Sequence, residues 1–140
     1  QKSASFDVAS KGVNTERILQ VIATLSGTTS YRRVVVKPAA PKEVVFGPAT
    51  VIGGSTTTVA GRVILDGRAG SSGVVVNLTR RFLPSWSVKA TIPDTVTVPA
   101  GKDRVNFPVT HEATGVDTTM IVTATANGKS ASGRLLITPP

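Results

Sequence analysis

Hydrophobic and polar residues alternate along several short stretches of this chain. The clearest stretch is 104–110, where Val105, Phe107 and Val109 alternate with polar residues or proline. A period of two places successive side chains on opposite faces of a strand. We therefore predict a half-buried strand at 104–110, with Pro108 on the outward face beside a free edge, because proline cannot donate to a ladder.

The rest of the chain from residue 43 divides into further short strands separated by turn residues. Gly47-Pro48 interrupts the first of them, and the kink would let that strand pass from one sheet to another. Asn127-Gly128 predicts a tight hairpin turn, because both positions of a type I′ turn need a positive φ. The predicted strands are 43–51, 55–66, 73–81, 87–92, 95–99, 120–126 and 130–138.

The chain also repeats itself. An ungapped offset of 101 residues aligns 1–39 with 102–140, with eight identical pairs that include Phe6 with Phe107 and Gly27 with Gly128. Hydrophobic positions agree as well, since Val34-Val35-Val36 aligns with Leu135-Leu136-Ile137. A shared pattern over so much chain indicates two copies of one structural unit, and Ser26-Gly27 then predicts a turn matching Asn127-Gly128.

The repeat defines two segments. Residues 1–38 are interpreted as the C-terminal strands of a preceding, incomplete repeat, and residues 39–140 as a complete repeat. The seam, Lys37 to Glu43, is short and rich in proline, which favours a semi-rigid linker. Two completions of 1–38 stay open: strands earlier in a longer natural chain, or strands supplied by another chain.

Composition supports an all-β fold. Val, Thr, Ser, Gly, Ala and Pro dominate the sequence, and β-branched residues pack well on a pleated surface. Short strands in a unit of about 100 residues favour a two-sheet sandwich of about 7–9 strands. The chain has no cysteine, so this sandwich lacks the disulfide of antibody domains.

Five short motifs mark turns and core positions along the complete repeat. They are Gly53-Gly54, Val98-Pro99-Ala100-Gly101, Phe107-Pro108-Val109, Thr123-Ala124-Thr125 with Gly128, and Leu135-Leu136-Ile137-Thr138-Pro139. In these motifs the chain resembles the tandem immunoglobulin-like repeats of large bacterial surface and secreted proteins. The resemblance implies an immunoglobulin-like β-sandwich with a structural role and no activity of its own, since the motifs describe turns and core positions.

The sequence offers little for catalysis or metal binding. His111 is the only histidine, and no glycine-framed serine accompanies it. Glu112 and Asp117 form the nearest approach to an acidic cluster, without the spacing of a calcium loop. We expect a non-enzymatic protein with no catalytic residue, no metal and no cofactor.

One loop departs from the family pattern and is the candidate binding site. Aromatic rings with interleaved cations suit sugars and anionic polymers. The alternative is that Phe82, Leu83 and Trp86 fold inward and cap the sandwich. The possible ligand-binding residues are Arg80, Arg81, Phe82, Trp86 and Lys89.

Net charge leaves the partner open. Sixteen basic residues against eight acidic ones give +8, spread along the chain, so we expect anionic surface polysaccharide rather than nucleic acid. No apolar run is long enough to span a membrane. We expect a spacer, stalk or filament component of a bacterial extracellular or cell-surface protein, whose partners are neighbouring repeats or like subunits. The alternative is an adhesion module that binds carbohydrate or polyanion through the Arg80–Trp86 loop.

Overall fold

The protein is all-β. The computed structural model describes residues 2–140, which form no helix, and hence none long and apolar enough to cross a membrane. The strands are β1 (Arg17–Leu25), β2 (Thr28–Val36), β3 (Pro41–Gly47), β4 (Thr50–Ile52), β5 (Val59–Leu65), β6 (Val74–Leu83), β7 (Ala90–Thr91), β8 (Thr95–Val98), β9 (Arg104–His111), β10 (Thr118–Ala126) and β11 (Lys129–Thr138).

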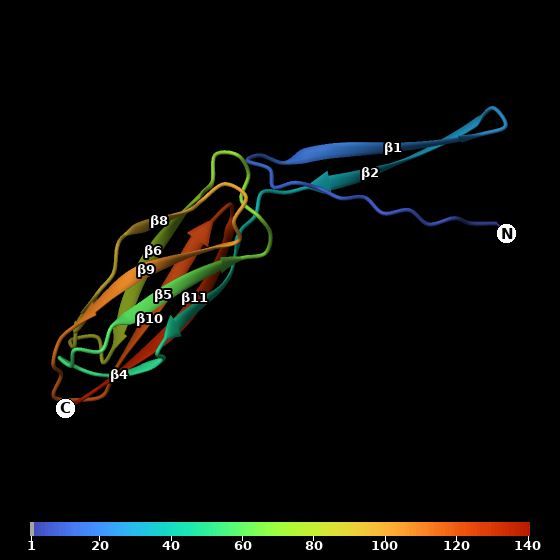
Figure 1. Cartoon of the computed structure of the whole chain (residues 1–140). Helices are drawn as coiled ribbons and strands as arrows, with labels where there is room; N and C mark the ends of the chain where they lie inside the picture. The colour runs from blue at the N-terminus through green and yellow to red at the C-terminus, as the bar shows by residue number, and fades with distance from the viewer. Residues whose placement is uncertain (1) are drawn as a thin grey trace.

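Strands β3 to β11 form a two-layer sandwich. One sheet has the order β4-β11-β10-β6-β8, and the other has the order β3-β5-β9-β7. Strands β1 and β2 form a separate hairpin, which projects from the end of the sandwich opposite the C-terminus (Figure 1). The predicted all-β sandwich is therefore confirmed, with one hairpin outside it.

The strand switch predicted at Gly47-Pro48 is confirmed. The chain leaves β3 in the four-stranded sheet at Gly47 and enters β4, which pairs in parallel with the end of β11 in the other sheet. The peptide bond between Gly47 and Pro48 is cis. The predicted strand 43–51 is thus two strands, and the switch ties the two layers together at their edge.

The core lies between the two sheets and follows the predicted alternation. Phe107 and Val109 of β9 are buried and Val105 is half-buried, while Met120, Val122 and Ala124 of β10 are buried from the other sheet. The Phe46 and Phe107 rings meet edge to face, with centroids 6.0 Å apart. The Phe107 ring also lies on Gly61, where an added Cβ would come within 2.1 Å of it.

Both predicted hairpin turns are present. Asn127 and Gly128 have φ angles of 49° and 77°, and Ser26 and Gly27 have 51° and 78°. The free edge expected at Pro108 is also seen, because β7 pairs with β9 only at Thr110 and His111. The strand predicted at 87–92 is shorter than expected, since only Ala90 and Thr91 pair.

Candidate functional site

The five predicted loop residues do not form one surface. Arg80 and Arg81 are neighbours in β6, so their side chains leave on opposite faces of the sheet. Phe82 points into the core and is only 7% exposed. Since its ring contributes to the hydrophobic core, Phe82 is not available to a ligand, and the loop keeps one of its two aromatic rings.

Trp86, in contrast, points outward. Its side chain is 74% exposed, and Leu83 and Val88 beside it are also exposed. The loop is anchored below these residues by Ser87, whose buried hydroxyl lies 2.7 Å from the hydroxyl of Thr118. The capping alternative therefore holds for Phe82 and not for Leu83 or Trp86.

The cations of this loop have different surroundings. Arg80 faces Asp94 at 3.9 Å, and the Asp94 side chain is 94% exposed, so this ion pair contributes little. Arg80, Arg81 and Val88 border an open depression of about 550 Å³ that Trp86 does not line. Lys89 is half-buried, and its carbonyl accepts a hydrogen bond of 2.9 Å from the amide of Glu112. The site expected from the sequence is thus divided, with Arg80, Arg81 and Phe82 at one depression and the exposed Trp86 outside it.

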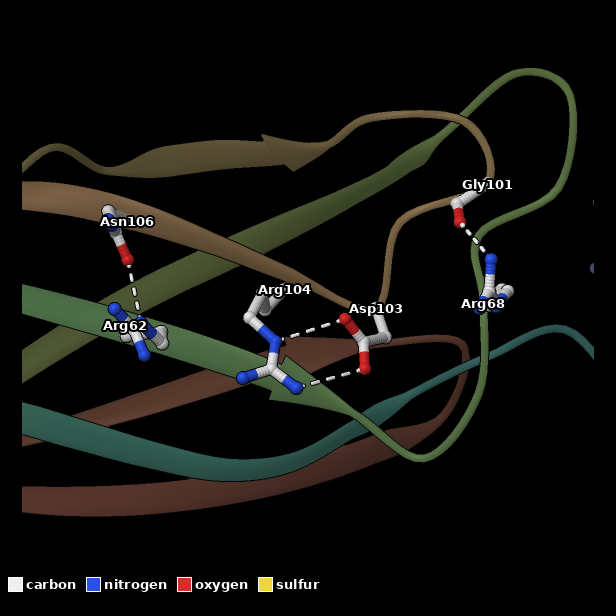
Figure 2. A network of polar contacts seen from close by, with 6 residues as sticks. All are labelled: Arg62, Arg68, Gly101, Asp103, Arg104 and Asn106. Atoms are coloured by element: carbon white, nitrogen blue, oxygen red, sulfur yellow. Dashed lines mark hydrogen bonds and ion pairs between the residues drawn. The ribbon is translucent and has the colours of Figure 1, made fainter.

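The basic residues around β5 and β9 bind local partners (Figure 2). Arg62 Nε donates to Asn106 Oδ1 at 2.8 Å, and Arg104 donates to both oxygens of Asp103 at 3.0 and 3.1 Å. The hydrogen bond from Arg104 lowers the pKa of Asp103, and the same contact raises the pKa of Arg104. These guanidinium groups face protein oxygens instead of converging on a common anion site.

His111 takes part in a structural contact at the end of β9. Because a carbonyl can only accept, Nε2 carries the proton and donates to the Thr57 carbonyl at 2.9 Å. Nδ1 is buried without a protein partner, as is the Ser55 hydroxyl, and both residues line an open hollow of about 580 Å³. Across residues 2–140, no three side chains of the His, Asp or Glu type gather in a way that could hold a metal ion.

The densest polar contacts between distant parts of the chain lie at the junction of the hairpin with the sandwich. Asn14 Nδ2 donates to the hydroxyls of Ser71 and Ser72 at 2.9 and 3.1 Å, and the Ser72 amide donates to Asn14 Oδ1 at 3.1 Å. Gly70 permits this approach, because an added Cβ would lie 2.2 Å from Asn14 Oδ1. Residues 12–14 are therefore fixed against the loop at 68–72.

A second set of contacts fixes the linker that leaves β2. The Ala40 amide donates to Asp66 Oδ1 at 2.8 Å, and Asn127 Nδ2 donates to the Ala39 carbonyl at 2.7 Å. Lys129 Nζ lies 3.1 Å from Asp66 Oδ2. Burial alone would raise the pKa of Asp66, but the Ala40 amide and the Lys129 ammonium outweigh it, so that pKa lies below its ordinary value of 3.8.

We call the two sets of contacts together the junction clamp. The first set joins Asn14 to Ser71 and Ser72, and the second set consists of the contacts among Ala39, Ala40, Asp66, Asn127 and Lys129. Sequence reasoning found a stiff linker at 37–43 from its prolines but missed these side chains. Only Asn127 carried a signal, as the first residue of a hairpin turn. Its second role depends on the linker passing that turn, 88 residues away in sequence.

A scan against protein-family models and a search of curated proteins found no match to this chain.

Proposed function

We propose that this chain is a non-enzymatic structural segment of a bacterial extracellular or cell-surface protein, built from tandem immunoglobulin-like repeats. In this proposal residues 39–140 are one complete repeat, and residues 1–38 are the closing strands of the repeat before it. The repeats act as a spacer, stalk or filament, because a row of stiffly joined sandwiches keeps a distal part of the protein away from its anchor.

The observation that carries this proposal is the agreement of register between the two hairpins. Nine residue pairs join β1 to β2, from Arg17↔Val36 to Leu25↔Thr28, and each has its counterpart 101 residues later, ending at Ala126↔Lys129. An offset found in the sequence thus reappears in hydrogen-bonded pairs and in turn geometry. Two elements this alike are most simply explained as the same part of two successive repeats.

The junction clamp supports a mechanical role. A proline-rich linker alone restricts bending only partly, whereas here both chain segments that pass between the hairpin and the sandwich are hydrogen-bonded to the sandwich. Ala39, Ala40 and Pro41 are also buried. Successive repeats joined in this way keep a fixed orientation, which a spacer or stalk requires.

The test measures the stiffness of the junction. The chain has no cysteine, so Thr24→Cys in β1 and Thr97→Cys in β8 provide the only two thiols for spin labels. We expect a narrow distribution of label distances, which Asn14→Ala broadens. Asn77→Ala, an exposed position in β6, serves as the control and should leave the distribution narrow. A broad distribution in the unaltered protein would contradict the proposal.

A second candidate function is binding of carbohydrate or polyanion at the loop that follows β6. The observation that favours it is the exposure of Trp86, because a large aromatic ring on a protein surface suits stacking on a sugar. Trp86 does not line the depression beside Arg80 and Arg81, and Phe82 is buried, which counts against a compact site. This candidate therefore ranks second.

A further inference from the structure

The β1–β2 hairpin has a hydrophobic face that nothing in residues 2–140 fully covers. The corresponding face of β10–β11 forms the centre of the sandwich, where Met120, Val122 and Leu135 are fully buried. Their counterparts are Leu19, Val21 and Val34, of which Leu19 and Val34 are 42% and 41% exposed. The hairpin therefore presents one half of a core.

The segment before β1 adds to this open face. Phe6 and Val8 correspond to Phe107 and Val109, which close the core from the opposite sheet. The N-terminal segment runs alongside the hairpin (Figure 1), and a hollow of about 330 Å³ remains between them. Its walls include Phe6, Val8, Val21, Ala23, Arg32 and Val34.

The hairpin also has an edge that is occupied in its counterpart. In the sandwich, β10 pairs with β11 on one side and with β6 on the other, in antiparallel register from Thr119↔Leu83 to Thr125↔Asn77. Strand β1 pairs with β2, and among residues 2–140 no strand lies on its other edge. A free edge beside an open apolar face accepts an added strand readily.

The added strand must differ from the strands of this chain. On the core face of the sandwich, Arg80 of β6, Val122 of β10 and Gly133 of β11 lie side by side in one row across the strands. The corresponding row of the hairpin contains Val21 of β1 and Arg32 of β2. Gly133 lies so close to β3 that an added Cβ would come within 2.2 Å of the Val44 carbonyl oxygen. Because Arg32 takes the place of Gly133, its side chain leaves no room for a strand packed as closely as β3. If β6 of a second copy were laid along β1, its Arg80 would bring a second positive charge into the row of Arg32.

We propose that the hairpin accepts an antiparallel β-strand from a partner, laid along β1 as β6 lies along β10, with apolar side chains at alternate positions and a carboxylate in the Val21–Arg32 row. The carboxylate follows from charge: an arginine on a face that becomes covered needs an acidic partner. Lys and Arg also outnumber Asp and Glu by six to two over residues 2–38. This inference rests on the proposed repeat relationship. It describes the strand that completes the repeat to which residues 1–38 belong.

Two synthetic peptides test the inference on the full chain. One has the sequence of residues 73–83, and the other carries Arg80→Glu in that sequence. In the proposed register this glutamate faces Arg32 across Val21. We expect the glutamate peptide to slow hydrogen exchange of β1 amides and to bind about fourfold more tightly than the unaltered peptide, because a carboxylate replaces a like charge two strands away from Arg32.

Two variants of the protein provide matched controls. Arg32→Ala should remove the preference for the glutamate peptide, whereas Arg33→Ala, on the opposite face of β2, should keep it. Equal affinity for both peptides, or no protection of β1 by either, would overturn the inference. Protection that appears without peptide and rises with protein concentration would also overturn it, because a second copy would then be the occupant. The stiffness of the junction is measured separately, so failure here leaves that result intact.

Discussion

At the scale of single residues, two glycines decide how closely the layers of the sandwich approach. Gly61 leaves room for the ring of Phe107, and Gly133 leaves room for the backbone of β3 at Val44. A ring can shift slightly, but a backbone carbonyl within a sheet cannot shift without disturbing its neighbours. Gly133 is therefore the more sensitive of the two positions.

We predict that Gly133→Ala destabilises the protein by about 1–3 kcal/mol, the range expected for overpacking a well-filled core. The measurement is the midpoint of urea denaturation. Gly115→Ala is the control, because an added Cβ at Gly115 meets nothing within 4 Å and its effect should stay within about 0.5 kcal/mol. Equal midpoints for Gly133→Ala and the unaltered protein would contradict this prediction, because they would show that β3 can shift to make room for the added methyl group.

The candidate loop shows how much residue-level reasoning can predict. β6 continues to Leu83, and side chains alternate between the two faces of a strand. Extending this alternation through the whole strand would have placed Arg80 and Arg81 on opposite faces and Phe82 on the inward face. The sequence prediction ended that strand at residue 81 and treated the following residues as one loop. The exposure of Trp86 could not be predicted, because it depends on where Ser87 meets Thr118 of a distant strand.

At the scale of elements, turn chemistry was the most reliable guide. Asn127-Gly128, Ser26-Gly27 and Gly47-Pro48 each have backbone requirements that few other residues meet, so their places in the fold followed from local sequence. The linker at 37–40 was different. Its prolines predicted stiffness, but its fixed path depends on Asp66 and Asn127, which no local pattern connects with it.

We predict that the junction clamp weakens in acid through Asp66. Its pKa in the folded protein lies below the ordinary value of 3.8, so its contribution to stability is complete above that pH and is lost as the pH falls through the lower folded value. In Asp66→Asn the amide oxygen can still accept from Ala40, but the attraction to Lys129 is gone. The stability difference between the protein and this variant should therefore shrink below pH 3.8.

Denaturation midpoints at neutral pH and near pH 3 measure this effect. Asp94→Asn is the matched control, since the Asp94 side chain is 94% exposed and its ion pair with Arg80 is long. The denaturation midpoint of Asp94→Asn should equal that of the unaltered protein at both pH values. A stability difference for Asp66→Asn that stays constant with pH would assign its effect to packing rather than to charge.

At the scale of the whole molecule, the net charge of +8 is distributed and not focused. Arg62 and Arg104 bind local oxygens, and Arg81 and Arg80 leave β6 on opposite faces. Attraction to an anionic polymer then depends on total charge and falls with added salt. A dedicated site would instead depend on a few particular side chains.

We therefore predict that Arg81→Ala lowers the salt concentration at which the protein elutes from heparin by no more than Arg134→Ala does. Both residues flank Ile121 on the outer face of the five-stranded sheet, which makes them a matched pair. Trp86→Ala should leave elution unchanged, because it removes no charge. A selective loss for Trp86→Ala or Arg81→Ala would instead favour the adhesion function and its loop.

The sequence by itself determined the all-β class, the turns, the inward faces of β9 to β11 and the offset of 101 residues, because alternation and positive-φ turns are local properties. The tertiary structure alone decided two other features. It exposed Trp86, and it fixed the junction clamp from residues as far apart as Ala39 and Asn127. Each depends on which distant segments come into contact, and single-sequence periodicity carries no information about such contacts.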